Sequence, residues 1–309
     1  MISFLKLIRV QNLLIIAFTQ YMVRWCILYP IFKLSDYELQ MSNFHFFLLS
    51  LSTVMIAAAG YIINDYFDVR IDKVNKPERM VIDKGVKRRV AMGAHTIINI
   101  LAVLIGFYVS WAVGAWKLVF IHILCSGGLW LYSTNFKRMF FIGNLVIALF
   151  TAMVPFIVGV YELWACYKWN VATVNFKNIA WYWICGLSFF AFITTLLREI
   201  IKDIEDYEGD KEYGCKTLPI VLGIRTAQVI VAILALATMS ILAYFQLALL
   251  ANSKISVYYF LIALQLPFVF LIYKTLTAKT KKEFRLAGNT AKFIMLMGVC
   301  YLFIIAFSS

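Results

Sequence analysis

The chain has 309 residues, of which 63% are hydrophobic, 17% aromatic and only 15% charged. A soluble domain is normally about half apolar and a quarter charged, so this composition excludes an ordinary soluble fold and indicates a polytopic membrane protein. The net charge of +13 is explained by basic loops on one side of a membrane, and we therefore expect no nucleic-acid partner.

Nine apolar segments are long enough to cross a bilayer, since a helix needs about 20 residues to span the hydrocarbon. They are residues 10–32, 44–64, 90–112, 116–133, 140–161, 179–198, 226–250, 256–273 and 290–307. Only a few residues around Gly114 separate the third and fourth segments, so the number of predicted spans depends most on how this region is divided. The sequence predicts an all-α integral membrane protein that forms a single polytopic domain over residues 1–309.

The basic residues set the orientation. If the N-terminus is cytoplasmic, 23 of the 29 Lys and Arg residues fall in cytoplasmic segments. The positive-inside rule then predicts a cytoplasmic N-terminus, with the basic surface facing anionic membrane lipids. The first apolar run is too long for a cleavable signal peptide, so we expect the chain to be held in the cell membrane by its own helices.

The acidic residues are confined to two connections that are expected on the cytoplasmic side. Twelve of the sixteen Asp and Glu lie between residues 65 and 83 or between residues 199 and 212. Each cluster contains three aspartates with offsets 0, 3 and 7, namely Asp65, Asp68 and Asp72 in the first and Asp203, Asp206 and Asp210 in the second. At about 100° per residue these offsets form a stripe on one helix face. Each trio therefore predicts a helix that continues past its membrane span.

Such a stripe is either a solvated surface with neighbouring cations or a site for a divalent cation. The repeated spacing, each time just after a span on the same side, favours the metal site. Mg²⁺ binds one or two carboxylates together with phosphate oxygens and water. Two facing trios could therefore hold a diphosphate, and basic side chains would have to converge there as well.

The two acidic stretches also carry a family resemblance. NDYFDVRIDKVNKPER and REIIKDIEDYEGDKEYGCKTLPI resemble the paired aspartate-rich motifs of the UbiA-type intramembrane prenyltransferases. The second stretch is most similar to the digeranylgeranylglyceryl phosphate synthase branch, in which IKDIED, EGD and KTLPI occur together. RVQNLLIIAFTQY, LYSTNFKR and GNLVIALFTA are similar to the first, fourth and fifth helices of the family.

The resemblance implies nine transmembrane helices around a central cavity, with cytoplasmic cap loops after helices 2 and 6. It implies that the six aspartates of the two trios hold Mg²⁺, which helps an allylic diphosphate to ionise before an acceptor captures the carbocation. Proton removal from the acceptor would fall to Asp206 or Asp210, the nearest candidate bases.

Further residues are candidates for binding the prenyl diphosphate donor or an anionic acceptor. They are Asn12, Asn64, Lys73, Arg79, Tyr132, Lys137, Arg138, Asn144, Arg198, Lys202 and Lys216. The basic residues are equally explained as topology charges. Asn12 and Asn144 are equally explained by interhelical hydrogen bonds, and Tyr132 by packing. Arg24 lies deep in the first span, and the sequence names no partner for it.

The acceptor expected from the resemblance is geranylgeranylglyceryl phosphate, which would be alkylated by a geranylgeranyl group to form an ether lipid. The alternative acceptor is aromatic, of the 4-hydroxybenzoate or naphthoate type used for quinones. A divalent-cation transporter is the alternative of another class. Transporter sites normally lie near the bilayer midplane, whereas these trios lie at the ends of spans.

Overall fold

The computed structural model describes residues 2–168, 174–249 and 252–308. Within these ranges the regular structure is helical, and no β-strand is formed. The chain divides into two compact units, each considered by itself below. The first is Met1–Phe136 with Met153–Gly186, and the second is Lys137–Ala152 with Leu187–Ser309.

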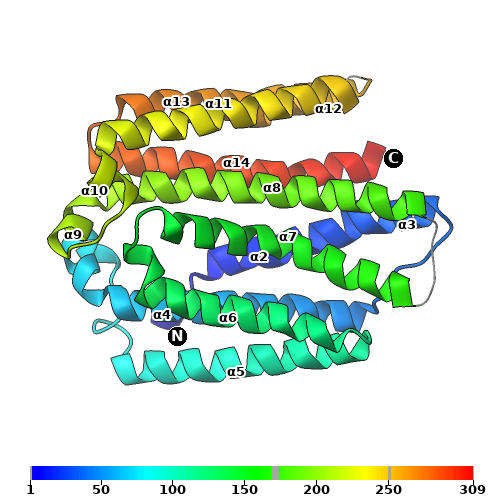
Figure 1. Cartoon of the computed structure of the whole chain (residues 1–309), viewed down its shortest axis with the longest axis horizontal. Helices are drawn as coiled ribbons and strands as arrows, with labels where there is room; N and C mark the ends of the chain where they lie inside the picture. Colours follow the sequence, from blue (N-terminus) through cyan, green and yellow to red (C-terminus); the bar gives the residue numbers. More distant parts are fainter. Residues whose placement is uncertain (1, 169–173, 250–251, 309) are drawn as a thin grey trace. The chain divides into compact units, whose positions relative to one another are not determined.

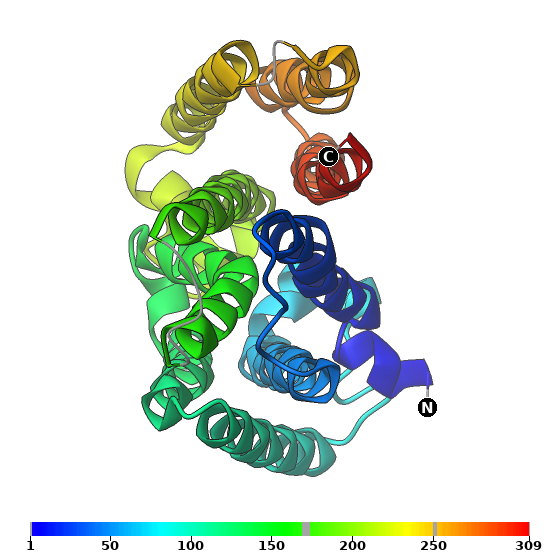
Figure 2. The ribbon, with the colours of Figure 1, turned by 90° about the vertical axis from the view of Figure 1, so that its right-hand side faces the viewer.

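The first unit is built around α4 (Asn43–Asn75), which packs against α2, α5 and α6 (Figure 1). Its other helices are α1 (Ile2–Leu7), α2 (Val10–Met22), α3 (Tyr29–Leu34), α5 (Arg88–Ala112) and α6 (Val119–Thr134). The later part of α7 (Ile142–Lys168) and the first part of α8 (Val174–Glu205) complete it, while the start of α7 and the end of α8 belong to the second unit. Figure 2, which looks along the helices, shows α2, α4 and α5 with similar axis directions.

In the second unit, α13 packs against both α11 and α14. The helices of this unit that follow α8 are α9 (Tyr207–Glu212), α10 (Leu218–Leu222), α11 (Ile224–Leu249), α12 (Lys254–Tyr259), α13 (Leu266–Thr277) and α14 (Lys281–Ser308). Gln228 of α11 caps the end of α13, because its side-chain amide donates to the carbonyls of Thr275 (2.8 Å) and Ala278 (3.0 Å).

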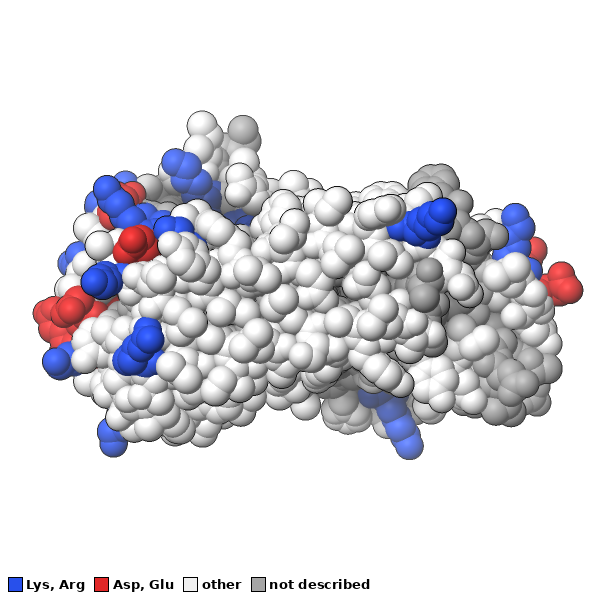
Figure 3. All heavy atoms as spheres, turned by 90° about the horizontal axis from the view of Figure 1, so that it is seen from above, with Lys and Arg blue, Asp and Glu red and all other residues white. Residues whose placement is uncertain are grey.

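Eight helical segments among the described residues are long and apolar enough to cross a membrane, so the chain is an integral membrane protein. They are Val10–Leu34, Asn43–Asn75, Arg88–Ala112, Ile142–Cys166, Asn178–Glu205, Ile224–Ala248, Lys254–Thr277 and Lys281–Ala306. Figure 3, viewed from the side of α11 and α13, shows few charged side chains over the middle of the helices, whereas Lys, Arg, Asp and Glu gather at their ends.

The predicted span at residues 116–133 is the one that these eight do not include. It corresponds to α6, whose 16 residues rise about 24 Å, less than the roughly 30 Å of hydrocarbon. The 3-10 turn Trp116–Leu118 directly precedes α6. The structure thus confirms eight of the nine predicted segments as helices of membrane length and leaves the ninth short.

The first span contains a π-helical segment, Val23–Leu28, between α2 and α3. Such segments are uncommon and are often found where a helix carries a functional or strained residue. Here the segment carries Arg24, whose side chain is almost completely buried. A second π-helical segment, Phe260–Gln265, lies between α12 and α13.

A chain of buried hydrogen bonds joins α4, α5, α6 and α7 within the first unit. The Ser52 hydroxyl donates to the carbonyl of Ala102 (2.7 Å), and its Oγ lies 2.8 Å from Nδ1 of His122. Nε2 of the same imidazole lies 2.9 Å from the hydroxyl of Tyr161, which also contacts Ser110 Oγ (2.6 Å). Because polar groups inside a membrane must find partners within the protein, this chain attaches the short α6 to three neighbouring helices.

The N-terminal helix α1 packs on the connection between α4 and α5. Leu7 is fully buried in an apolar cluster with Ile62 and Val69 of α4, Ile82 of the connection and Ala91 of α5. This connection also contains the 3-10 turn Pro77–Arg79. The cluster therefore holds the connection close to the end of α4 that carries the first aspartate trio.

Candidate metal and diphosphate site

The first aspartate trio lies on a single helix, as the spacing predicts. α4 has 33 residues and is about 50 Å long, so it extends well past the hydrocarbon core. Asp65 accepts a hydrogen bond from Arg9 Nη2 (2.7 Å), and the buried Asp68 accepts one from Asn64 Nδ2 (2.8 Å). Asp72 follows one turn later and is half-buried. All three carboxylates of the first trio therefore lie on one helix.

Arg9, which the sequence indicated only as one of the cytoplasmic basic residues, contacts the first trio through Asp65. It lies between α1 and α2 in the left-handed backbone region (φ 52°, ψ 55°), and its guanidinium also lies 5.0 Å from the ring centroid of Tyr61. Burial lowers the pKa of Arg9, but the charge of Asp65, the hydrogen bond to it and smaller contributions from Tyr61 and Asp68 together raise the pKa above its usual value. The signal that could have identified Arg9 is its position directly before the first span.

The second trio departs from the predicted helix. α8 ends at Glu205, Asp206 lies at the junction, and α9 begins at Tyr207. Asp203 is therefore in the last turn of α8, whereas the buried Asp210 is in α9. The prediction of one continuous helical stripe is wrong for this trio, because φ and ψ of Asp206 (−94°, 6°) leave the helical range between α8 and α9, although its N–H still bonds to the Lys202 carbonyl (2.9 Å).

Three candidate residues of the second unit have direct partners among its acids. Asn144 of α7 donates through Nδ2 to Oδ2 of Asp203 (2.8 Å). Arg198 and Lys202 both contact the buried Glu199, at 2.6 Å and 3.6 Å. Part of the positive charge of Arg198 and Lys202 is therefore balanced by Glu199, which the sequence analysis did not single out.

Lys137 and Arg138 form a 3-10 turn with Phe136, and the carbonyl of Arg138 accepts from the backbone N–H of Lys216 (2.9 Å). This bond brings the polypeptide segments of Arg138 and Lys216 together, and both side chains are exposed. Arg138 and Lys216 are thus the exposed residues among the basic candidates of the second unit.

The remaining candidates belong to the first unit. Asn12 is half-buried in α2, Lys73 is exposed on α4, and Tyr132 is buried in α6. The side chain of Arg79 lies outside the described residues.

The donor atoms of the two trios suit Mg²⁺, a hard cation that prefers oxygen ligands. No group of three or more His, Cys, Asp or Glu side chains forms a metal cage by itself in the described ranges. Mg²⁺ is usually bound by one or two carboxylates, with water and substrate phosphates completing its shell. The residues present therefore fit a metal that binds together with a diphosphate.

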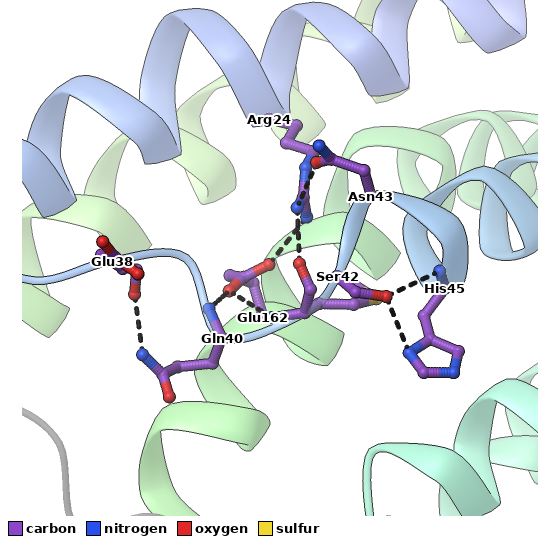
Figure 4. Close-up of polar contacts among 8 residues, drawn as sticks. Arg24, Glu38, Gln40, Ser42, Asn43, His45 and Glu162 are labelled. Carbon is purple, nitrogen blue, oxygen red and sulfur yellow. Dashed lines mark hydrogen bonds and ion pairs between the residues drawn. The ribbon is translucent and has the colours of Figure 1, made fainter.

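Arg24, for which the sequence named no partner, is bonded to Glu162 of α7 (Figure 4). Its Nη1 lies 3.0 Å from Glu162 Oε2, and its Nη2 donates to the carbonyl of Met41 and to Asn43 Oδ1. The other carboxylate oxygen accepts from the backbone N–H groups of Gln40 and Met41. The sequence signal for this pair is that Arg24 lies inside one apolar segment and Glu162 directly follows another. Charged residues at such positions must find partners within the protein.

Comparison with known proteins gives the family. The UbiA prenyltransferase family profile matches residues 36–305. The digeranylgeranylglyceryl phosphate synthase of Methanosphaera stadtmanae is 34% identical over 196 residues, which cover 63% of this chain and 64% of that protein. The enzyme of the same name from Methanobrevibacter smithii is 35% identical over 183 residues, covering 59% and 60%. The chain thus matches slightly less than two thirds of the length of these curated relatives.

Solved structures share the fold. A structure of digeranylgeranylglyceryl phosphate synthase in membranes matches with a TM-score of 0.62 at 23% identity, covering 99% of this chain and 98% of the other. A UbiA homologue from Aeropyrum pernix matches with a TM-score of 0.63 at 15% identity, covering 94% and 97%. A UbiA homologue from Archaeoglobus fulgidus, bound to GPP and Mg²⁺, matches with a TM-score of 0.55 at 16% identity, covering 98% and 99%.

Proposed function

Because this chain belongs to the UbiA prenyltransferase family, we propose that it transfers a prenyl group from an allylic diphosphate to an acceptor in the membrane. The donor is geranylgeranyl diphosphate and the acceptor geranylgeranylglyceryl phosphate, which gives an ether lipid. The names of the curated relatives support this choice of acceptor. The observation that carries the proposal is the pair of aspartate trios with equal spacing, one carboxylate of each being held by an asparagine amide.

Both trios serve the same donor diphosphate in this proposal. The residues that hold Mg²⁺ are Asp65, Asp68, Asp72, Asp203, Asp206 and Asp210. When bound, the metal supplies positive charge that neutralises the charge developing on the leaving diphosphate. The homologue bound to GPP and Mg²⁺ supports this cofactor and this class of donor.

The reaction breaks the bond between the allylic carbon and the diphosphate oxygen, and the bonding electron pair leaves with the diphosphate. The hydroxyl oxygen of the acceptor then forms a bond to the allylic carbon, and its proton passes to a carboxylate. Asp206 or Asp210 accepts this proton, since both belong to the second trio. Tyr132 helps to shelter the cation by cation–π attraction, and Asn12 contacts the substrate.

The phosphate of the acceptor carries about two further negative charges. Lys137, Arg138 and Lys216 are proposed to bind it, since Arg138 and Lys216 are exposed and their segments are joined by a backbone hydrogen bond. Lys73 and Arg79 are proposed to bind the donor diphosphate together with Asn64. Arg198 and Lys202 contribute less, because Glu199 already balances part of their charge.

The proposal includes a topology of nine spans around a central cavity, with cytoplasmic caps after the second and sixth. It also includes a single domain over residues 1–309, a cytoplasmic N-terminus and residence in the cell membrane. α6 would be the ninth span, with the 3-10 turn Trp116–Leu118 adding about 6 Å to its length.

A competition experiment tests the proposal. Purified protein with Mg²⁺ and geranylgeranyl diphosphate receives geranylgeranylglyceryl phosphate and 4-hydroxybenzoate at equal concentration, and the products are identified by mass. We expect the digeranylgeranyl ether and its loss on removal of Mg²⁺ with a chelator. Prenylation of the aromatic acid alone would overturn the ether-lipid assignment, and Mg²⁺ transport without any prenylated product would overturn the enzyme assignment.

A further inference from the structure

In the second unit, an expected metal ligand is held by a neutral side chain from another helix. Asn144 of α7 is 6% exposed, and its Nδ2 lies 2.8 Å from Oδ2 of Asp203 in the last turn of α8. The two residues are 59 positions apart, so this contact depends on the packing of α7 against α8. The first unit has a local counterpart, the 2.8 Å bond from Asn64 to Asp68 within α4.

The chemistry of the contact assigns the orientation of the amide. The NH₂ group of Asn144 donates to Asp203, and this is the orientation that suits the ionised, metal-binding form of the carboxylate, which only accepts hydrogen bonds. The bond is made to Oδ2 of the Asp203 carboxylate and restricts rotation of that group. It therefore prepares the orientation of Asp203 before any ligand binds.

The neutrality of the donor distinguishes this contact from the ion pairs that other acids of the two clusters make. Arg9 balances the charge of Asp65, and Arg198 and Lys202 balance that of Glu199. An amide donates a hydrogen bond and leaves the full negative charge on the carboxylate. A residue that must orient an anion and keep its charge for a cation needs a neutral donor, and Asn144 meets both requirements.

We infer that Asn144 is a positioning residue that orients Asp203 for Mg²⁺, and not a ligand of the substrate; this rests on the proposed function of the second trio. Hydrogen-bond partners that orient a metal ligand typically change metal affinity by about 10- to 100-fold when they are removed. An interhelical bond with a purely structural role would instead change stability and leave metal affinity unaltered.

Mn²⁺ binding measured by electron paramagnetic resonance tests the inference, with full-length protein in detergent and inorganic diphosphate present to complete the shell of the metal. Asn144→Leu keeps the approximate side-chain volume but removes the donor, and it should weaken Mn²⁺ binding by about 10- to 100-fold. Thr151→Val is the matched control in α7, since among the described residues the Thr151 hydroxyl bonds to the Ile147 carbonyl of its own helix (2.9 Å). This variant should bind Mn²⁺ as the unchanged protein does.

The Asp203→Asn variant distinguishes failure of the positioning role of Asn144 from failure of the proposed metal site. If Asp203→Asn loses Mn²⁺ binding while Asn144→Leu and Asn144→Ala keep it, the positioning role is overturned and the metal site stands. If Asp203→Asn keeps full binding, the proposed metal site itself is overturned. Melting temperature and gel-filtration profile report folding, and if neither Asn144 variant folds, Asn144 is assigned to structure and the inference is rejected.

Discussion

The guanidinium of Arg24 and the carboxylate of Glu162 form a buried ion pair with 3.0 Å between Nη1 and Oε2. The two side chains are 2% and 0% exposed, so both charges are removed from water. Arg24 also lies 4.6 Å from the ring centroid of Phe46, and Glu162 accepts from the backbone of the connection before α4. The pair therefore joins α7, the π-helical segment of the first span and this connection (Figure 4).

We expect Glu162→Gln to destabilise the protein by about 3–5 kcal/mol, because it leaves the charge of Arg24 buried without its counter-charge. The double variant Arg24→Met with Glu162→Leu should recover most of this loss, since it removes both desolvated charges. Apparent melting temperatures in detergent provide the measurement. Arg24→Met and Glu162→Leu are also measured alone, and a double variant as unstable as the sum of these two changes would show that the pair does not act as a unit.

Gly106 allows the His122 ring to approach α5. A Cβ atom at this position would lie 2.6 Å from Cγ and Nδ1 of the imidazole. Gly106→Ala should therefore displace His122, break its bonds to Ser52 and Tyr161, and cost about 1–3 kcal/mol in unfolding free energy. Gly93→Ala is the control in the same helix, where nothing lies within 4 Å, and it should be neutral or slightly stabilising. Equal thermal shifts for both variants would contradict the close-approach argument.

Removing one carboxylate from either trio should abolish most of the proposed activity. Asp68→Asn and Asp206→Asn each withdraw a charge from the metal-binding set, and a fall of about 10²–10³-fold in kcat is expected for a lost electrostatic stabiliser. Initial rates over a range of Mg²⁺ concentrations provide the measurement, with melting temperatures to confirm folding. Full Mg²⁺-dependent turnover in either variant would show that this trio is not required.

The connections after α4 and α8 should face the same side of the membrane as the N-terminus. Single cysteines at Val86 and Tyr213, in a background lacking the six native cysteines, should react with an impermeant maleimide only from the cytoplasmic side. Labelling is measured in two preparations of sealed vesicles, one exposing the cytoplasmic face and the other exposing the opposite face. Reaction of the two positions from opposite faces would contradict the proposal that both trios serve one diphosphate.

Local periodicity explains why much of this protein could be predicted from its sequence. Eight of the nine predicted spans are helices of membrane length, because about 20 consecutive apolar residues are recognisable without knowledge of their neighbours. The first trio lies on one helix as its spacing requires. The second does not, since the offsets of Asp203, Asp206 and Asp210 could not reveal the helix break at Asp206.

By itself, the sequence determined that the chain is a membrane protein with two matching aspartate trios, since composition, span length and residue spacing are local properties. Only the tertiary structure decided which groups are paired. Arg24 meets Glu162 across 138 positions, Arg9 meets Asp65 across 56, and Asn144 meets Asp203 across 59. Such contacts depend on which faces of distant helices pack together, and inside a membrane each buried polar group takes the partner that this packing brings within reach.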